Sequence, residues 1–408
     1  MEGCKSRLDE LAVFGGRPIF AEPLHVGRPS LGASEMFLER VRASLGRRWM
    51  TNDGPLVREL ETKLADYLGV RHCLAVCNGT VALQLVAKAL GLSGDVLVPA
   101  FTFIATAHAF EWLGIRPVFC DIDPKTHNVN PCSVERMITP RTTAIVGVHL
   151  WGRPCAIEAL EVVARRHRLE LLFDAAHAFG CSHRGMRIGR FGGAEVFSFH
   201  ATKFFTTGEG GAVSTDDDEL ASRLRRMRNF GFAGYDEVVE VGTNAKMGEL
   251  AAAVGLSSFE SLPETVEANL RSYRDYQRGL RDLPGITLLS YDEKEENNYQ
   301  YIVAQIDEAE AGLSRDDLQQ VLWAENVLAR RYFWPVCHRM EPYSSRDPEL
   351  RSHLPATEEV AGRVLCLPGG PGVERGQIAT VCDIVRSVAE RATEVRRRLS
   401  ASRAPSAA

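Results

Sequence analysis

Within the 408 residues of the chain we expect no segment that directs a protein into or across a membrane. Its first residues, MEGCKSRLDELAVFGG, hold no continuous apolar stretch and do not fit a secretory signal. The best candidate for a membrane span, 100–115, is interrupted by Thr, His and Glu. The ten cysteines form no C-x-x-C pair, so we expect reduced core thiols in a cytoplasmic protein.

The chain also lacks a strong charge and the common nucleotide-binding motifs. Its net charge is −5 and its pI about 6.2, so we expect neither nucleic acid nor an anionic membrane as a partner. No G-x-x-x-x-G-K-[ST] and no G-x-G-x-x-G after a strand is present, which excludes a P-loop and a dinucleotide fingerprint. The 45% hydrophobic and 25% charged residues are typical of a globular protein, long enough for a large core and a second domain.

Short β-branched runs alternate with helical patterns between residues 55 and 215. The expected strands are "CLAVC", "DVLVPA", "PVFCDID", "TAIVGVHL", "LELLFDAA", "EVFSFH" and "GAVST". Helical patterns such as "GTVALQLVAKALGL", "FIATAHAFEWLG" and "AIEALEVVARRHR" lie between them. This alternation predicts an α/β fold in which helices cover both faces of a mostly parallel sheet.

The character of the sequence changes near residue 265. A long polar helix is expected over about 263–282, and shorter signals such as "GITLLS", "YQYIVAQI" and "RDDLQQVLWAENV" follow it. We therefore expect four parts: an N-terminal segment (1–30), a large domain (31–265), a smaller C-terminal α+β domain (266–398) and a disordered tail (399–408).

Polar residues follow the carboxyl ends of the expected strands, where open parallel sheets bind ligands. Gly79 and Thr80 open a helix whose N-terminus favours an anion, although a plain capped turn would have the same sequence. Asp174 ends the apolar "LELLF" strand, and Lys203 stands in the hydroxyl-rich "FSFHATKFFTTGEGG". A buried lysine loses its proton easily and becomes a nucleophile for a carbonyl. Together with Ser198, these residues supply the lysine, the acid and the phosphate cup that pyridoxal 5′-phosphate needs.

Two further features leave alternatives open. Asp121 and Asp123 form a D-x-D, which would fit a metal-dependent glycosyltransferase. The following "PKTHNVNP" favours a turn and no second acidic cluster supports a metal, so we expect none. His200 is either an additional acid or base, or a residue packed at the end of a strand.

The chain resembles the DegT/DnrJ/EryC1/StrS family of sugar aminotransferases over nearly its whole length. The segments that carry the resemblance are "WMTNDGPLVRELETKLADYLGV", "CNGTVALQL", "VPAFTFIATAHA", "FDAAHAFG", "FSFHATKFFTTGEGGAV", "RNFGFAG" and "GTNAKMGELAAAVGL". The resemblance implies a fold-type-I pyridoxal-phosphate enzyme, similar to aspartate aminotransferase, with a mostly parallel sheet of the seven-stranded type. Some relatives carry histidine in place of Lys203 and act as dehydratases, so the lysine favours transamination.

The resemblance also implies a role for each site residue. Lys203 bonds the cofactor and then moves a proton, while Asp174 keeps the ring nitrogen protonated. His177 lies beside the phenolic oxygen, and Phe103 stacks on the ring. Gly79, Thr80 and Ser198 hold the phosphate. Asn244 reaches the phosphate of the neighbouring subunit, which implies a homodimer with shared active sites.

The segment 329–348 resembles the one in members that aminate C4 of a dTDP-4-keto-6-deoxyhexose. Its cations and aromatic residues suit a diphosphate and a sugar or base, or else form a packed surface loop; they are Arg330, Arg331, Tyr332, His338 and Tyr343. The expected reaction takes an amino group from L-glutamate, or glutamine, and gives a 4-amino-4,6-dideoxyhexose nucleotide, as in natural-product deoxysugar biosynthesis. The alternatives are a 3-keto-sugar or cyclitol aminotransferase, and a non-catalytic regulator that keeps the fold.

Overall fold

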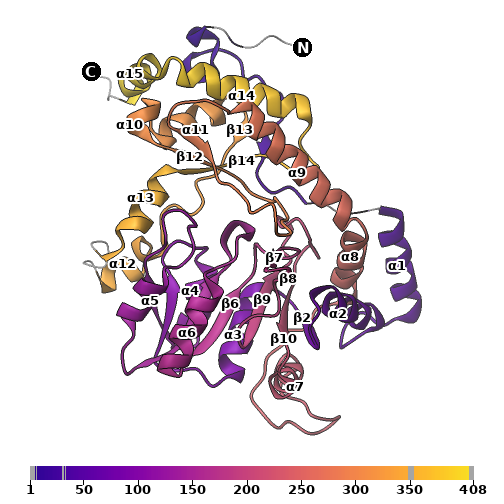
Figure 1. Ribbon diagram of the computed structural model, residues 1–408. Helices are drawn as coiled ribbons and strands as arrows, with labels where there is room; N and C mark the ends of the chain where they lie inside the picture. The colour runs from indigo at the N-terminus through magenta and orange to yellow at the C-terminus, as the bar shows by residue number, and fades with distance from the viewer. Residues whose placement is uncertain (1–4, 6, 30–31, 33, 348–352, 404–408) are drawn as a thin grey trace, which may run out of the picture.

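The computed structural model describes residues 5, 7–29, 32, 34–347 and 353–403. A seven-stranded sheet forms the lower part of the molecule in Figure 1, in the order β2-β10-β9-β6-β5-β3-β4. Only β10 runs opposite to the other six strands of this sheet, which confirms the predicted mostly parallel α/β fold. The strands are β2 His72–Val76, β3 Asp95–Pro99, β4 Arg116–Cys120, β5 Thr142–Val148, β6 Glu170–Asp174, β9 Ala194–Ser198 and β10 Gly211–Thr215.

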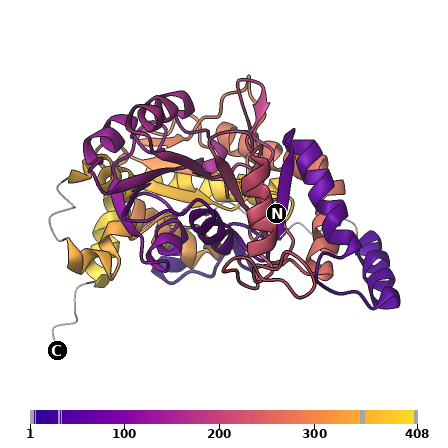
Figure 2. The same ribbon diagram turned by 90° about the horizontal axis from the view of Figure 1, so that it is seen from below.

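Alternate side chains of these strands enter two separate cores, because successive residues of a strand point to opposite faces. Val96 and Val98 pack with one group of helices, whereas Leu97 between them packs with the other. Figure 2 shows helices on both sides of the sheet. The first group is α3 Gly79–Ala89, α4 Ala105–Glu111 and α7 Asp218–Met227; the second is α2 Pro55–Leu68, α5 Pro131–Met137, α6 Ile157–His167 and α8 Glu249–Glu260. The helix α1, Ser34–Arg47, packs on α8.

A three-stranded antiparallel sheet, β11-β12-β14, forms the upper part of the molecule (Figure 1). The helix α9, Leu262–Gly279, begins directly after α8 and packs on α14. The predicted domain boundary at 265–266 thus falls within the first turns of α9, and the division into domains stays a prediction. The further elements after α9 are β11 Ile286–Leu288, β12 Ile302–Ile306, α10 Glu308–Ala311, α11 Arg315–Ala324, α12 Tyr343–Arg346, α13 Pro355–Arg363, β14 Val364–Leu367, α14 Arg375–Ala389 and α15 Ala392–Arg403. Of these, α12 lies beside the large sheet, where Tyr343 joins its core (Figure 1).

The N-terminal segment packs against this C-terminal part. Strand β1, Leu24–His25, pairs in parallel with β13, Val327–Leu328. The carboxylate of Glu325, fully buried, accepts hydrogen bonds from the Lys5 amine and from two backbone N–H groups of the segment. A short hairpin of β7, Ser182–His183, and β8, Met186–Arg187, completes the described strands.

The predicted disordered tail is wrong for residues 399–403, which continue α15. Leu399 is completely buried in the core of the C-terminal part, and Arg398 pairs with Asp9 and Glu394. These contacts stabilise α15 over its last described turns. The pair of Arg398 and Asp9 also joins segments that lie far apart in sequence. Residues 404–408 lie outside the described residues. In the described part of the chain, no helix is both long and apolar enough to cross a membrane.

Candidate active site

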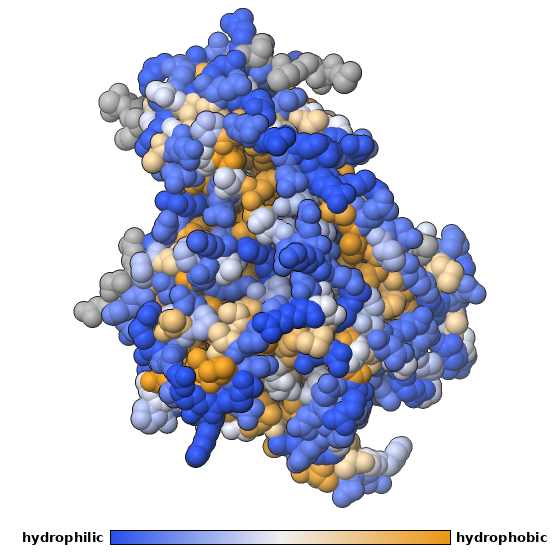
Figure 3. Space-filling view, viewed as in Figure 1, coloured by the Kyte–Doolittle hydropathy of each residue, from blue (hydrophilic) through white to orange (hydrophobic). Residues whose placement is uncertain are grey.

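A cavity of about 680 Å³ opens at the carboxyl ends of β2, β3, β5, β6 and β9. It therefore lies where the strand pattern predicts a ligand site. Eight of the predicted residues line it: Gly79, Thr80, Phe103, Asp174, His177, Ser198, Lys203 and Tyr332. The three-stranded sheet closes the opposite wall, since Tyr301 immediately precedes β12 and also lines the cavity. On the face shown in Figure 3, apolar surface gathers in the waist between the two parts of the molecule.

A larger and more open groove, of about 940 Å³, lies between α10, α13 and α15. Its charged side chains neutralise one another: Arg396 contacts Glu308 at 2.8 Å, and Arg363 contacts Glu359 at 3.0 Å. None of the residues predicted to carry chemistry lines it. The smaller cavity at the sheet edge is therefore the candidate active site.

The Lys203 amine lies in the cavity within 3.2 Å of the Tyr301 hydroxyl. Burial lowers the pKa of Lys203 to about 8, and the negative charge of Asp174 opposes this shift only in part. A pKa near 8 leaves a useful fraction of neutral amine at physiological pH. Lys203 is thus suited to attack a carbonyl carbon.

Asp174 ends β6 with its carboxylate buried beneath the cavity. Its oxygens accept hydrogen bonds from the Thr106 hydroxyl at 2.8 Å and from the Ala176 N–H at 3.1 Å. Burial nevertheless raises the pKa of Asp174, although these two donors and Lys203 lower it. A cationic N–H donor in the cavity would stabilise the charge of such a buried carboxylate.

His177 is buried on the same wall and is neutral, because burial, together with the charge of Lys203, lowers its pKa well below the usual value. Its Nδ1 accepts the Trp151 backbone N–H at 3.3 Å. The remaining proton of the neutral ring is therefore on Nε2. His177 can donate this proton in a hydrogen bond to an oxygen of a ligand.

The start of α3 forms an anion cup with the end of β9. The N–H groups of Gly79 and Thr80 belong to the first turn and have no acceptor within the helix. Asn78 caps the helix by accepting the Val81 N–H at 2.8 Å. A Cβ at Gly79 would lie 3.1 Å from the Ser198 Cβ, so glycine allows Ser198 to approach the helix closely. The same turn that caps the helix thus also exposes N–H groups to a phosphate.

Four predicted substrate residues lie away from the cavity wall, and one of them, Arg331, contacts Asp316 at 3.1 Å. Arg330 is exposed and pairs through its backbone with Cys366. His338 is buried and contacts Glu358 at 2.8 Å, while the buried ring of Tyr343 packs edge-on against Phe119. Of this group, the structure brings only Tyr332 to the cavity.

Asp121, Asp123 and His200 each form hydrogen bonds within the protein. Asp121 accepts the Thr357 N–H and hydroxyl, both at 2.8 Å, at the start of α13. Asp123 accepts the N–H groups of Lys125 and Thr126, which makes the predicted turn. His200 lines the cavity mouth and bonds Thr202 at 2.9 Å.

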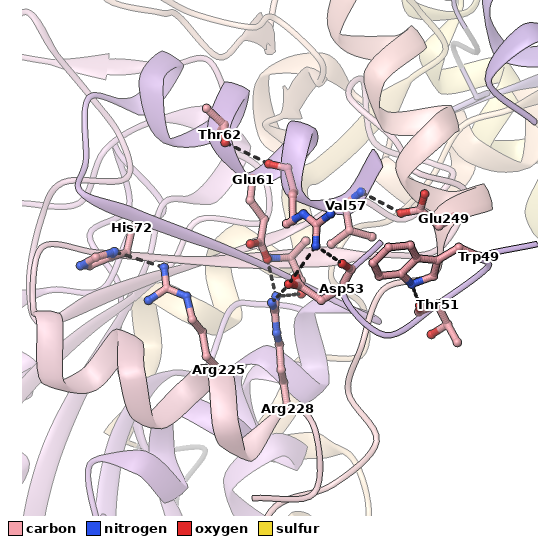
Figure 4. A network of polar contacts seen from close by, with 12 residues as sticks. Trp49, Thr51, Asp53, Val57, Glu61, Thr62, His72, Arg225, Arg228 and Glu249 are labelled. Carbon is pink, nitrogen blue, oxygen red and sulfur yellow. Dashed lines mark hydrogen bonds and ion pairs between the residues drawn. The ribbon is translucent and has the colours of Figure 1, made fainter. Parts of the chain in front are cut away.

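Asn244 is exposed on a firmly held segment outside this cavity. Its neighbour Ala245 bonds through its N–H to the Arg228 carbonyl at 3.0 Å. The buried Arg228 guanidinium in turn lies between Glu61 and Asp53 (Figure 4). The segment therefore presents Asn244 to the outside of the molecule rather than to the cavity of its own chain.

Sequence reasoning missed two residues that shape the site. Thr106 stands in the predicted helix after β3 and bonds Asp174. Tyr301 stands in the "YQYIVAQI" run of the C-terminal part and bonds Lys203. The helical position of Thr106 was a possible signal, because it opens a helix at the sheet edge. No local pattern distinguishes Tyr301 from the other tyrosines around it.

The site fits pyridoxal phosphate in its donor chemistry. A Cβ at Gly79 would crowd the cup, and Gly79, Lys203 and Asp174 line one cavity. The buried carboxylate of Asp174 suits a protonated ring nitrogen, and the Nε2–H of His177 suits a ring oxygen.

The sequence profile of the DegT/DnrJ/EryC1/StrS aminotransferase family matches residues 33–386. The chain belongs to this family. It is thus a pyridoxal-phosphate-dependent aminotransferase with the expected fold. The dTDP-4-amino-4,6-dideoxy-D-glucose transaminase of Shigella dysenteriae is 36% identical over 347 residues, which cover 85% of this chain and 94% of that protein.

Two solved structures of aminotransferases align closely with the chain. DesI, crystallised in the presence of its TDP-sugar product, is 48% identical with a TM-score of 0.91; the match covers 97% of this chain and all of that one. DesV of S. venezuelae, in complex with a ketimine intermediate, is 32% identical with a TM-score of 0.82, over 90% of this chain and 99% of that one. The similarity extends through the whole cavity-forming region rather than through one motif.

Proposed function

We propose that the protein transfers an amino group from L-glutamate to the C4 ketone of a dTDP-4-keto-6-deoxyhexose, giving a dTDP-4-amino-4,6-dideoxyhexose. The observation that carries the proposal is the Lys203 amine in the same cavity as Asp174 and the cup at Gly79. The choice of sugar rests on the relatives named as dTDP-4-amino-4,6-dideoxy-D-glucose transaminases and on the TDP-sugar product of DesI.

When bound, pyridoxal phosphate supplies an aldehyde carbon for the amino group and a ring that withdraws electrons. Lys203 would hold the cofactor covalently and, once free, move a proton with its Nζ. Asp174 would keep a proton on the ring nitrogen. His177 would donate its Nε2–H to the phenolic oxygen, and Ser198 with the start of α3 would hold the phosphate.

The cavity supports a large substrate with an aromatic portion. Beyond the predicted ring-stacking Phe103, it is lined by Trp112, Tyr332 and Phe333. Phe103 and Trp112 expose 59% and 84% of their surface, which is unusual for such large apolar rings. Aromatic faces of this kind suit a nucleobase or a sugar ring.

The regiochemistry of the product tests the proposal. The purified enzyme is incubated with L-glutamate and, separately, with a dTDP-4-keto-6-deoxyhexose and a dTDP-3-keto-6-deoxyhexose. NMR of each product identifies the carbon that bears nitrogen. Nitrogen at C4 supports the proposal. If only the 3-keto sugar is aminated, the proposal is wrong and the enzyme is a 3-keto-sugar aminotransferase.

We further propose that the enzyme works as a homodimer with shared active sites. Asn244 is exposed and does not line the cavity of its own chain. The loop after α7 exposes apolar surface at the lower edge of Figure 3. Its exposed apolar residues are Phe230, Phe232, Tyr235, Val238, Val239 and Val241. Such a patch is typical of a subunit interface.

Mixing two inactive variants tests the shared site. A Lys203→Ala chain keeps Asn244, and an Asn244→Ala chain keeps Lys203, so a mixed dimer holds one complete site. Random exchange should therefore restore about a quarter of the wild-type activity. If the mixture stays as inactive as its components, the sites are not shared through Asn244.

A further inference from the structure

The hydroxyl of Tyr301 is the closest polar contact described for the Lys203 amine, at 3.2 Å. Lys203 stands in the turn after β9 of the seven-stranded sheet, whereas Tyr301 precedes β12 of the three-stranded sheet. The two residues are 98 positions apart in the chain. The Lys203 amine is therefore contacted by a residue from the other part of the molecule.

The ring of Tyr301 is held firmly. It lies 4.4 Å from the His177 ring and 5.3 Å from the Trp151 ring, measured between centroids. Its carbonyl accepts the Tyr291 hydroxyl at 2.8 Å. Because Tyr301 exposes only 6% of its surface, its hydroxyl has little freedom to leave the amine.

A phenol suits this position better than a carboxylate. Burial raises the pKa of Tyr301 well above its usual value, so the hydroxyl keeps its proton. It can therefore accept a hydrogen bond from the ammonium form of Lys203 and donate one to the neutral amine. A carboxylate would only accept, and its charge would favour the ammonium form.

We propose that Tyr301 is a positioning residue that holds the Lys203 amine toward the cofactor whenever the two are not bonded. This inference rests on the proposed role of Lys203. In the step that follows, the amine nitrogen adds to the aldehyde carbon and a carbon–nitrogen double bond forms. The aldehyde oxygen leaves as water with the two amine protons, and Tyr301 ends with the proton it began with.

The remaining titratable groups that line the cavity are Asp174, His177, His200, Glu209 and Tyr332. Of these, Asp174 is the one whose charge raises the pKa of Lys203. None of them is changed when Tyr301 becomes phenylalanine. A shift in the titration of the amine in that variant is therefore due to the lost hydroxyl.

The test compares Tyr301→Phe with a matched control, Tyr273→Phe. The Tyr273 hydroxyl is also buried in the C-terminal part, but it donates to the Leu289 carbonyl at 3.3 Å. Both full-length variants are stripped of cofactor, and the rate at which each captures pyridoxal phosphate is followed by stopped-flow absorption across pH 6–10. Thermal melting verifies that both fold, which the retained ring contacts favour.

We expect the plateau rate of Tyr301→Phe to fall about tenfold, because the amine is no longer oriented. The midpoint of its pH profile should move down by about one unit, because the ammonium form loses a charge-assisted acceptor. Tyr273→Phe should keep the wild-type plateau and midpoint.

A wild-type plateau and midpoint in Tyr301→Phe would overturn the inference, as would equal changes in both variants. A Lys203→Ala protein distinguishes a failure of the inference about Tyr301 from a failure of the proposed role of Lys203. If it still forms the absorption band of a covalently bound cofactor, the role of Lys203 itself is wrong. If it loses the band while Tyr301→Phe keeps the wild-type profile, only the inference about Tyr301 fails.

Discussion

Replacing Gly79 by alanine should weaken the phosphate cup without unfolding the protein. The new Cβ would lie 3.1 Å from the Ser198 Cβ and 3.4 Å from the Phe197 carbonyl oxygen. Both contacts are to β9, so the start of α3 and the end of β9 must separate by a few tenths of an ångström. This separation weakens the hydrogen bond that we propose Ser198 makes to the phosphate.

A hydrogen bond to a charged group contributes about 1.5–3 kcal/mol. Its loss corresponds to roughly a 10- to 100-fold rise in the cofactor dissociation constant. The assay is a titration of cofactor-free protein with pyridoxal phosphate, together with thermal melting. Gly376→Ala is the matched control, since Gly376 also lies in the first turn of a helix and a Cβ there meets nothing within 4 Å.

We expect Gly376→Ala to bind the cofactor as the wild type does. The reasoning would be refuted by a Gly79→Ala protein that melts at the wild-type temperature and has an unchanged dissociation constant. It would also be refuted if both variants lost affinity equally, because the effect would then not come from the cup.

Three more predictions follow from the site and its surroundings. Asp174→Asn should lower turnover about 100-fold or more, because an amide cannot stabilise a charged ring nitrogen; steady-state kinetics measures this. In the wild type, the rate of cofactor capture should rise with pH up to about 8 and then level off, because burial lowers the pKa of Lys203 to about 8 and only the neutral amine attacks; a rise that continues past pH 10 would contradict this. Glu325→Gln should lower the free energy of unfolding by about 3 kcal/mol, because the buried carboxylate holds Lys5 and two backbone N–H groups. The control is the exposed pair of Glu308 and Arg396: Glu308→Gln should lower the free energy of unfolding by less than about 1 kcal/mol. Chemical denaturation measures both variants.

The parts of the site that follow strand ends could be predicted from the sequence. Asp174 and Gly79 each stand next to an apolar run that ends in polar residues, and the carboxyl ends of parallel strands meet at one edge. The alternation of strands and helices therefore predicted both the fold and the place where these residues lie. The observed α4 is shorter than the predicted helix, because the residues before Ala105 form the turn that brings Phe103 to the cavity.

Contacts between distant segments could not be predicted in this way. His338 has the chemistry of a phosphate ligand, but Glu358, 20 residues later, binds its ring inside the protein. Tyr301 approaches Lys203 only because the three-stranded sheet packs over the cavity. Leu399 holds the end of the chain helical through a core that forms from many segments. Each of these contacts depends on tertiary packing, which cannot be predicted from periodicity or local composition.

Reduction of the resting enzyme with borohydride tests the central claim most directly. The reagent converts the bond between the cofactor and its lysine into a stable amine, so digestion and mass spectrometry identify the modified residue. The account predicts that the cofactor mass stays on the peptide that contains Lys203. Modification of another lysine instead, such as the partly buried Lys246 beside Asn229, would contradict it.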